Sequence, residues 1–115
     1  MDRSFETLNL ADFEARAAEA AQLLKAMANE NRLMVLCYLL AGGEVSVSAL
    51  AEAVDLSQSA LSQHLAKLRE DGLVTYRRES QTLFYRVDDA RALRVLAVLK
   101  DIFCPDLTPS KDLQP

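Results

Sequence analysis

The feature that most constrains the fold is a pair of short helical patterns over residues 46–72 with a tight turn between them. Apolar residues recur at helical spacing on both sides of Asp55-Leu56-Ser57, and Ser46 and Ser57 stand where a helix N-cap is expected. Gly72 follows at a position where a positive φ ends many helices. The pattern therefore predicts a helix, a turn and a second helix that ends before this glycine.

Two runs rich in β-branched and aromatic residues follow the helix pair, over residues 73–78 and 82–87. Glu79-Ser80-Gln81 separates them, so they predict a β-hairpin, although its turn lacks the glycine that usually favours one. A helix, a turn, a second helix and a hairpin in this order predict a winged helix-turn-helix, in which the hairpin is the wing.

Apolar spacing predicts three further helices, over residues 12–28, over residues 29–40, and from Asp88 or Asp89 to Phe103. The first of them carries a stripe of apolar residues, namely Phe13, Ala17, Ala20, Ala21 and Leu24. Cys37 lies on the stripe of the second helix that is expected to be buried. The predicted fold class is mainly α with a β-hairpin wing, a winged helix-turn-helix of five helices.

The chain of 115 residues has room for one domain and none for a separate catalytic domain. That domain is predicted to span residues 11–104, between a flexible N-terminus at 1–10 and a disordered tail at 105–115. No run of apolar residues is long enough to cross a bilayer, and the first residues lack the layout of a signal peptide. We therefore expect a cytoplasmic protein with no membrane partner.

The distribution of charge says more about a partner than the net charge of −4 does. Residues 57–87 carry five basic and three acidic side chains, whereas each of the other segments has an acidic excess. In a helix-turn-helix the second helix enters the major groove of DNA. A positive segment that spans this helix and the hairpin predicts double-stranded DNA as the partner, although the acidic total leaves a protein-binding winged helix open.

Polar side chains off the apolar face of the second helix are the candidates for contact with base edges and phosphates. They are Gln58, Ser59, Ser62, Gln63, His64 and Lys67. In the hairpin the candidates are Arg77, Arg78, Gln81 and Arg86. Any one of them could simply face solvent, and His64 could be a partly exposed helix residue instead of a phosphate contact. The helix pair and the basic hairpin together favour DNA.

Two stretches, Ser57-Gln58-Ser59-Ala60-Leu61-Ser62-Gln63-His64-Leu65 and Leu68-Arg69-Glu70-Asp71-Gly72-Leu73-Val74, resemble the core of the ArsR family of bacterial repressors. Lys25-Ala26-Met27-Ala28-Asn29-Glu30-Asn31-Arg32-Leu33 resembles the segment in which that family begins its second helix. The resemblance covers residues 15–104. It implies a homodimer through the first and last helices that binds an inverted repeat with half-sites about one helical turn apart.

Many members of this family bind metals, but the corresponding residues differ here. Where the family can carry a Cys-x-Cys, Ser46 and Ser48 supply neutral hydroxyls, which are poor ligands for soft metals. The last helix, which carries Asp and His pairs in other members, contains no histidine. We therefore predict no metal and no cofactor, although a site built from Cys37, Cys104 and nearby carboxylates stays open.

The two cysteines are the remaining candidates for sensing a signal. Taken alone, Cys37 is expected to be a small core residue, whereas Cys104, just before Pro105, is expected to reach solvent. Leu36-Cys37-Tyr38 and Ile102-Phe103-Cys104 resemble the sulfide- and persulfide-responsive branch of the family. The resemblance implies that the reduced dimer binds its operator. Reactive sulfur species then convert the thiols to persulfides or to a bridge of several sulfurs, and the affinity for DNA falls.

The sequence leaves other functions open. A regulator of the same fold could sense peroxide through a disulfide, or could sense a soft metal. A thiol enzyme is disfavoured because the one histidine lies on the DNA-facing helix and no second activated group accompanies a cysteine. The sequence does not decide between a repressor and a protein that displaces another silencer.

Overall fold

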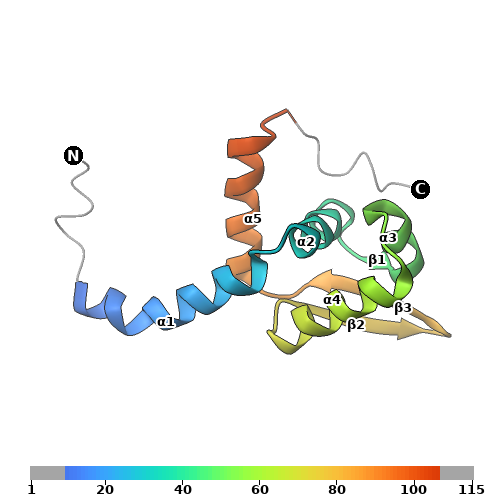
Figure 1. Ribbon diagram of the computed structural model, residues 1–115, viewed down its shortest axis with the longest axis horizontal. Coiled ribbons are helices and arrows are strands. Elements are labelled where there is room, and N and C mark those ends of the chain that lie inside the picture. The colour runs from blue at the N-terminus through green and yellow to red at the C-terminus, as the bar shows by residue number, and fades with distance from the viewer. Residues whose placement is uncertain (1–9, 107–115) are drawn as a thin grey trace.

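The structure, a computed structural model, describes residues 10–106 and has five helices and three strands within them (Figure 1). In chain order these are α1 (Leu10–Met27), α2 (Glu30–Gly42), β1 (Val45–Ser46), α3 (Val47–Val54), α4 (Gln58–Glu70), β2 (Val74–Glu79), β3 (Thr82–Val87) and α5 (Ala90–Phe103). The predicted winged helix-turn-helix is confirmed: α3 and α4 are the helix pair, and β2 and β3 form the wing. The predicted terminal segments lie almost wholly outside the described residues, but Leu10, placed in the first of them, already begins α1.

Side-chain caps fix the starts of four helices. Asn29, Ser46, Ser57 and Asp89 each accept a hydrogen bond from the backbone N–H three residues on, at distances of 3.1–3.2 Å. Such caps satisfy N–H groups that have no partner inside the helix, and each stabilises a helix by about 1 kcal/mol. The caps predicted at Ser46 and Ser57 are confirmed, and Asp89, not Asp88, caps the last helix.

Residues with a positive φ stand at the ends of three helices and in the hairpin turn. Asp55 (φ 54) ends α3, while Gly43 and Gly72 (both φ 79) follow α2 and α4. α2 runs two residues beyond the predicted end at Leu40, because Gly43 is the first residue with a positive φ. In the hairpin turn Ser80 takes φ 58, so a serine occupies a conformation that usually favours glycine.

A short strand that the sequence analysis missed completes the sheet. β1 pairs antiparallel with β3, with Val45 opposite Tyr85, and the strand order is β1-β3-β2. Two residues are too few to show an alternating pattern, so this strand depends on the partner that it meets in space. It attaches the loop after α2 to the wing.

The core joins α2, α3, α4 and α5 to the sheet. Its fully buried large side chains are Val35, Leu36, Leu39, Leu50, Leu61, Leu65, Leu68, Leu73 and Leu96. Leu61, Leu65 and Leu68, the apolar residues at helical spacing in α4, are all buried. Their burial leaves the opposite face of α4 free for a partner.

α1 contacts the core mainly through its last turns, where Leu23, Ala26 and Met27 are buried. The predicted apolar stripe of α1 is exposed over its whole length, and Leu24 is 56% exposed. Phe103, placed with the apolar residues of the last helix, is 74% exposed. Figure 1 shows α1 extending away from the other helices and the sheet, and nothing within residues 10–106 covers this stripe.

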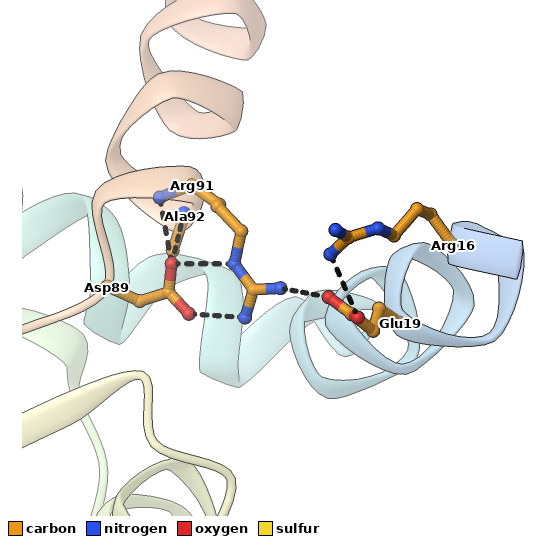
Figure 2. Close-up of polar contacts among 5 residues, drawn as sticks. All are labelled: Arg16, Glu19, Asp89, Arg91 and Ala92. Atoms are coloured by element: carbon orange, nitrogen blue, oxygen red, sulfur yellow. Dashed lines mark hydrogen bonds and ion pairs between the residues drawn. The ribbon is translucent and has the colours of Figure 1, made fainter. Parts of the chain in front are cut away.

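Arg91 links the start of α5 to α1. Figure 2 shows its guanidinium between two carboxylates, 2.8 Å from Oδ2 of Asp89 and 3.6 Å from Oε2 of Glu19. The hydrogen bond from Arg91 lowers the pKa of Asp89, because it favours the charged carboxylate. The contact with Glu19 joins two exposed side chains, so it orients the helices more than it stabilises the fold. Among the described residues no helix has both the length and the apolarity to cross a membrane.

Candidate nucleic-acid interface and thiol pair

The polar face of α4 is open to solvent, as a helix that reads DNA requires. Five of the six residues singled out there, Gln58, Ser59, Ser62, Gln63 and Lys67, are exposed, and His64 is half-buried. Lys67 lies 3.8 Å from the carboxylate of Asp71, one turn further along the helix. The face therefore presents amides and hydroxyls near the start of α4 and positive charge near its end.

A groove of about 410 Å³ separates this helix from the wing. Its polar lining comes from α3, α4 and the wing, and consists of Ser48, Gln58, Ser62, Arg69, Gln81 and Thr82. Leu65, Leu83 and Tyr85 are among its apolar lining residues. Because Gln81 lies in the hairpin turn, the tip of the wing and the start of α4 share one concave surface.

Arg77 and Arg78, adjacent in sequence, lie on opposite faces of the hairpin. Pairing of Arg77 with Phe84 and of Tyr76 with Tyr85 places Arg78 on the face that carries the buried Tyr85. Arg77 lies on the other face, and so does Arg86. The sequence alone predicts no difference among the three arginines. The pairing register of the two strands places Arg78 on one face of the hairpin and the other two on the opposite face.

Carboxylates hold both arginines of that other face. Arg77 Nε lies 2.9 Å from Glu44, its Nη1 lies 2.8 Å from Glu79, and its guanidinium stacks on the ring of Phe84. Arg86 lies 3.2 Å from Asp88. The hydrogen bonds that Arg77 donates to Glu79 and, as the smaller cause, to Glu44 raise the pKa of Arg77, because they favour the charged guanidinium. No local pattern points to Glu44, which lies 33 positions before Arg77 in the sequence.

Cys37 lies on α2 and Cys104 directly follows α5, and these two helices pack together. Both thiols are free and exposed. The expectation that Cys37 is a buried core residue is therefore wrong: Val35, Leu36 and Leu39 fill the core-facing side of α2 instead. Cys104, which follows the last residue of α5, was expected to reach solvent and does.

Cys37 has a raised pKa, first because neighbouring protein atoms displace part of its water and second because the charge of Cys104 opposes its ionisation. The second cause requires the two sulfurs to be close enough for one to respond to the charge of the other. Position 104 is 67 residues further along the chain. A raised pKa lowers the thiolate fraction of Cys37 near neutral pH, and the thiolate is the nucleophilic form.

The side chains that would form a metal site are not gathered together. Within residues 10–106 there is no group of three or more His, Cys, Asp or Glu side chains that could hold an ion. Ser46, which stands where a metal-binding cysteine could be, has its Oγ occupied by the α3 cap. The described part of the chain thus offers the cysteines no third ligand.

Comparison with known proteins identifies the family. A sequence profile of bacterial regulatory proteins of the arsR family matches residues 29–76. The transcriptional activator HlyU of Vibrio cholerae is 50% identical over 97 residues, which cover 84% of this chain and 89% of HlyU. The chain belongs to the ArsR family. The family indicated by the motifs around α4 is confirmed.

Other relatives of this ArsR-family chain include the biofilm growth-associated repressor of Agrobacterium fabrum, 47% identical over 91 residues that cover 79% of this chain and 77% of the repressor. The crystal structure of HlyU from Vibrio vulnificus CMCP6 matches with a TM-score of 0.78 and 49% identity, over 84% of this chain and 100% of that one. A homodimeric winged helix-turn-helix domain from Mycobacterium bovis matches with a TM-score of 0.68 and 30% identity, over 89% and 85%. The chain is thus a transcription regulator with a DNA-binding fold, and these relatives are regulators and not enzymes.

Removal of the Glu44 carboxylate is expected to strengthen DNA binding. In Glu44→Gln one of the two carboxylates that neutralise Arg77 is lost, so the wing becomes more positive toward the phosphates. We expect affinity for a mixed-sequence duplex to rise about two- to three-fold at low salt, measured by fluorescence anisotropy. Glu14→Gln, which removes the same charge from α1, is the control, and equal affinities of the two variants would contradict the prediction.

Removal of the Cys104 thiol is expected to lower the pKa of Cys37. The charge of Cys104 opposes ionisation of Cys37, so Cys104→Ser removes one of the two causes of the raised pKa and leaves the other, the partial loss of water around the Cys37 thiol. The thiolate fraction of Cys37 near neutral pH should rise. The measurement is the rate of alkylation of the Cys37 peptide against pH, followed by mass spectrometry. An unchanged midpoint would mean that Cys37 does not respond to Cys104.

Proposed function

We propose that this chain is a homodimeric repressor whose affinity for its operator is switched by reactive sulfur species through Cys37 and Cys104. The observation that carries the proposal is the placement of two exposed thiols, Cys37 on α2 and Cys104 at the end of α5, on helices that pack together although the two residues are distant in sequence. The charge of Cys104, which helps to raise the pKa of Cys37, agrees with this placement. In the reduced state the start of α4 reads base edges in the major groove and the wing lies against the neighbouring backbone.

Dimerisation is supported by the apolar surface that one copy leaves open. Exposed large apolar side chains concentrate on α1 and α5, and include Leu10, Phe13, Leu24, Val98, Ile102 and Phe103. Exposed large apolar side chains gathered on two helices are typical of an interaction surface. We assign it to a second copy because the likeness to the Mycobacterium bovis domain, described as homodimeric, covers 89% of this chain.

The chemistry needs only the two thiols and a persulfide donor. A cysteine thiolate attacks the outer sulfur of the donor, the S–S bond of the donor breaks, and the donor leaves as a thiolate while the protein gains one sulfur. Cys37 is the weaker first attacker because its thiolate fraction is lowered, so we place this step at Cys104. If both cysteines become persulfides, the end of one attacks the protein-bound sulfur of the other. A trisulfide then bridges them and hydrosulfide leaves, without any external oxidant.

A bridge between these positions would tie α2 to the end of α5. α5 carries part of the proposed dimer surface, and Arg91 at its start holds Glu19 of α1. A change in how α5 sits on α2 would therefore change how the two recognition helices of a dimer are spaced. A coupling of only about 1–3 kcal/mol alters affinity about 5–150-fold, which is sufficient for a switch.

The dimer surface is tested by Val98→Glu. Val98 is 55% exposed in one copy, and a buried carboxylate in an apolar interface would be strongly unfavourable. We expect the mass measured by analytical ultracentrifugation to fall from that of a dimer to that of a monomer, with the helical circular dichroism kept. Val98→Ala stays apolar and should remain dimeric. A dimer in the glutamate variant would show that subunits meet elsewhere.

The thiol switch is tested by titrating operator DNA before and after treatment with a persulfide donor. The duplex is one selected by the reduced wild-type protein from a random pool. We expect treatment to weaken wild-type binding at least five-fold, whereas Cys37→Ser and Cys104→Ser keep the untreated affinity and do not respond. Release of DNA by either treated variant would refute the two-thiol switch.

Mass spectrometry of the treated wild-type protein separates the remaining alternatives. Added sulfur atoms support the proposal. Loss of two hydrogens after peroxide, with release of DNA by peroxide alone, would make the protein a peroxide sensor instead. A bound metal ion with the same release would make it a metal sensor. Failure of the reduced protein to select any duplex would favour a partner other than DNA.

A further inference from the structure

We infer that Arg69, near the end of α4, binds the DNA phosphate backbone where it passes between the recognition helix and the wing. This inference rests on the proposed mode of DNA binding and adds a residue to it. Arg69 lines the groove between α4 and the hairpin together with Gln58 and Ser62, which precede it on the same face of the helix. Spacings of four and seven residues along an α-helix bring side chains to one face, which is the sequence signal that could have found it.

The position of Arg69 is fixed by stacking on the wing. Its guanidinium carbon lies 5.0 Å from the centre of the Tyr76 ring, and that ring lies 5.3 Å from the ring of Tyr85. A guanidinium over an aromatic face is attracted by the ring electrons and keeps its N–H groups directed outward from the rim. Arg69 thus joins α4 to β2 while its donors stay available.

The charge of Arg69 is not neutralised by a neighbour. Within residues 10–106 it makes no ion pair, whereas Arg77, Arg86 and Lys67 each contact a carboxylate. A phosphate that approaches Arg77 or Arg86 must compete with carboxylates already in place. A phosphate that enters the groove meets an exposed guanidinium with no such competitor.

Duplex geometry places a phosphate at this groove. When a recognition helix occupies a major groove and a wing reaches the adjacent minor groove, the strand that separates the two grooves runs between them. In this chain the space between the helix and the wing is the groove of about 410 Å³, with Gln81 and Thr82 on its wing side. Arginine suits this position because its donors form a planar fork that matches phosphate oxygens.

The test is the salt dependence of binding to a mixed-sequence duplex. Each phosphate contact contributes about 0.9 to the slope of log affinity against log salt concentration, so Arg69→Gln should reduce the slope by about 2 per dimer. We also expect affinity at moderate salt to fall about ten-fold, equally on mixed-sequence and selected duplexes, because a phosphate contact carries no sequence information. Arg69→Lys should keep most of the slope, since it retains the charge.

Two controls keep the outcome clear. Arg16→Gln removes the same charge from α1, far from the groove, and should leave the salt slope unchanged. A reduced slope in this variant would mean that the experiment measures net charge and not a phosphate contact. Tyr76→Leu removes the stacking ring, and should lower affinity several-fold while it keeps the slope. If circular dichroism shows that Arg69→Gln does not fold, the test passes to Arg69→Lys, which keeps the charge. A salt slope reduced by about 2 in this lysine variant would overturn the assignment.

Failure of this inference can be told apart from failure of the proposed function. If the wild-type protein binds DNA and Arg69→Gln has the same slope, Arg69 makes no phosphate contact while the DNA-binding mode stands. If the wild-type protein shows no salt-dependent binding to any duplex, the proposed mode fails first and the inference fails with it.

Discussion

Burial of the inner face of α4 is the constraint on which the rest of this structure depends. Leu61, Leu65 and Leu68 are fully buried, and complete burial of such a side chain contributes about 1.5–3 kcal/mol. Because these leucines fix the rotation of the helix, they also fix which residues face outward. The polar face of α4, the groove beside the wing and the position of Arg69 all follow from that rotation.

Ion pairs between side chains, more than the net charge, decide where this protein presents positive charge. The positive segment that the sequence shows over residues 57–87 is divided in the folded chain. Carboxylates hold Arg77 and Arg86 on one face of the hairpin, while Arg69 keeps its charge in the groove on the other. A protein of net charge −4 can thus present a positive surface at one place, with the acidic pairs limiting attraction elsewhere.

Local patterns predicted most of the fold because the signals are local. Caps at Ser46 and Ser57, the leucine spacing of α4 and the glycine after it each act within a few residues, so the helices and the turn were found. β1 was missed, since its two residues become a strand only by pairing with β3. Cys37 was misplaced because the sequence shows an apolar helix without showing which side of it meets the core.

The sequence by itself determined the order of the elements, the family and the identity of the residues that could meet DNA or react as thiols. Only the tertiary structure decided which of them can act together. The hairpin register separated Arg78 from Arg77, and the packing of α2 on α5 let Cys37 respond to the charge of a residue 67 positions away. The reason is physical: helical and strand propensities act over neighbouring residues, whereas charges and thiols interact through space.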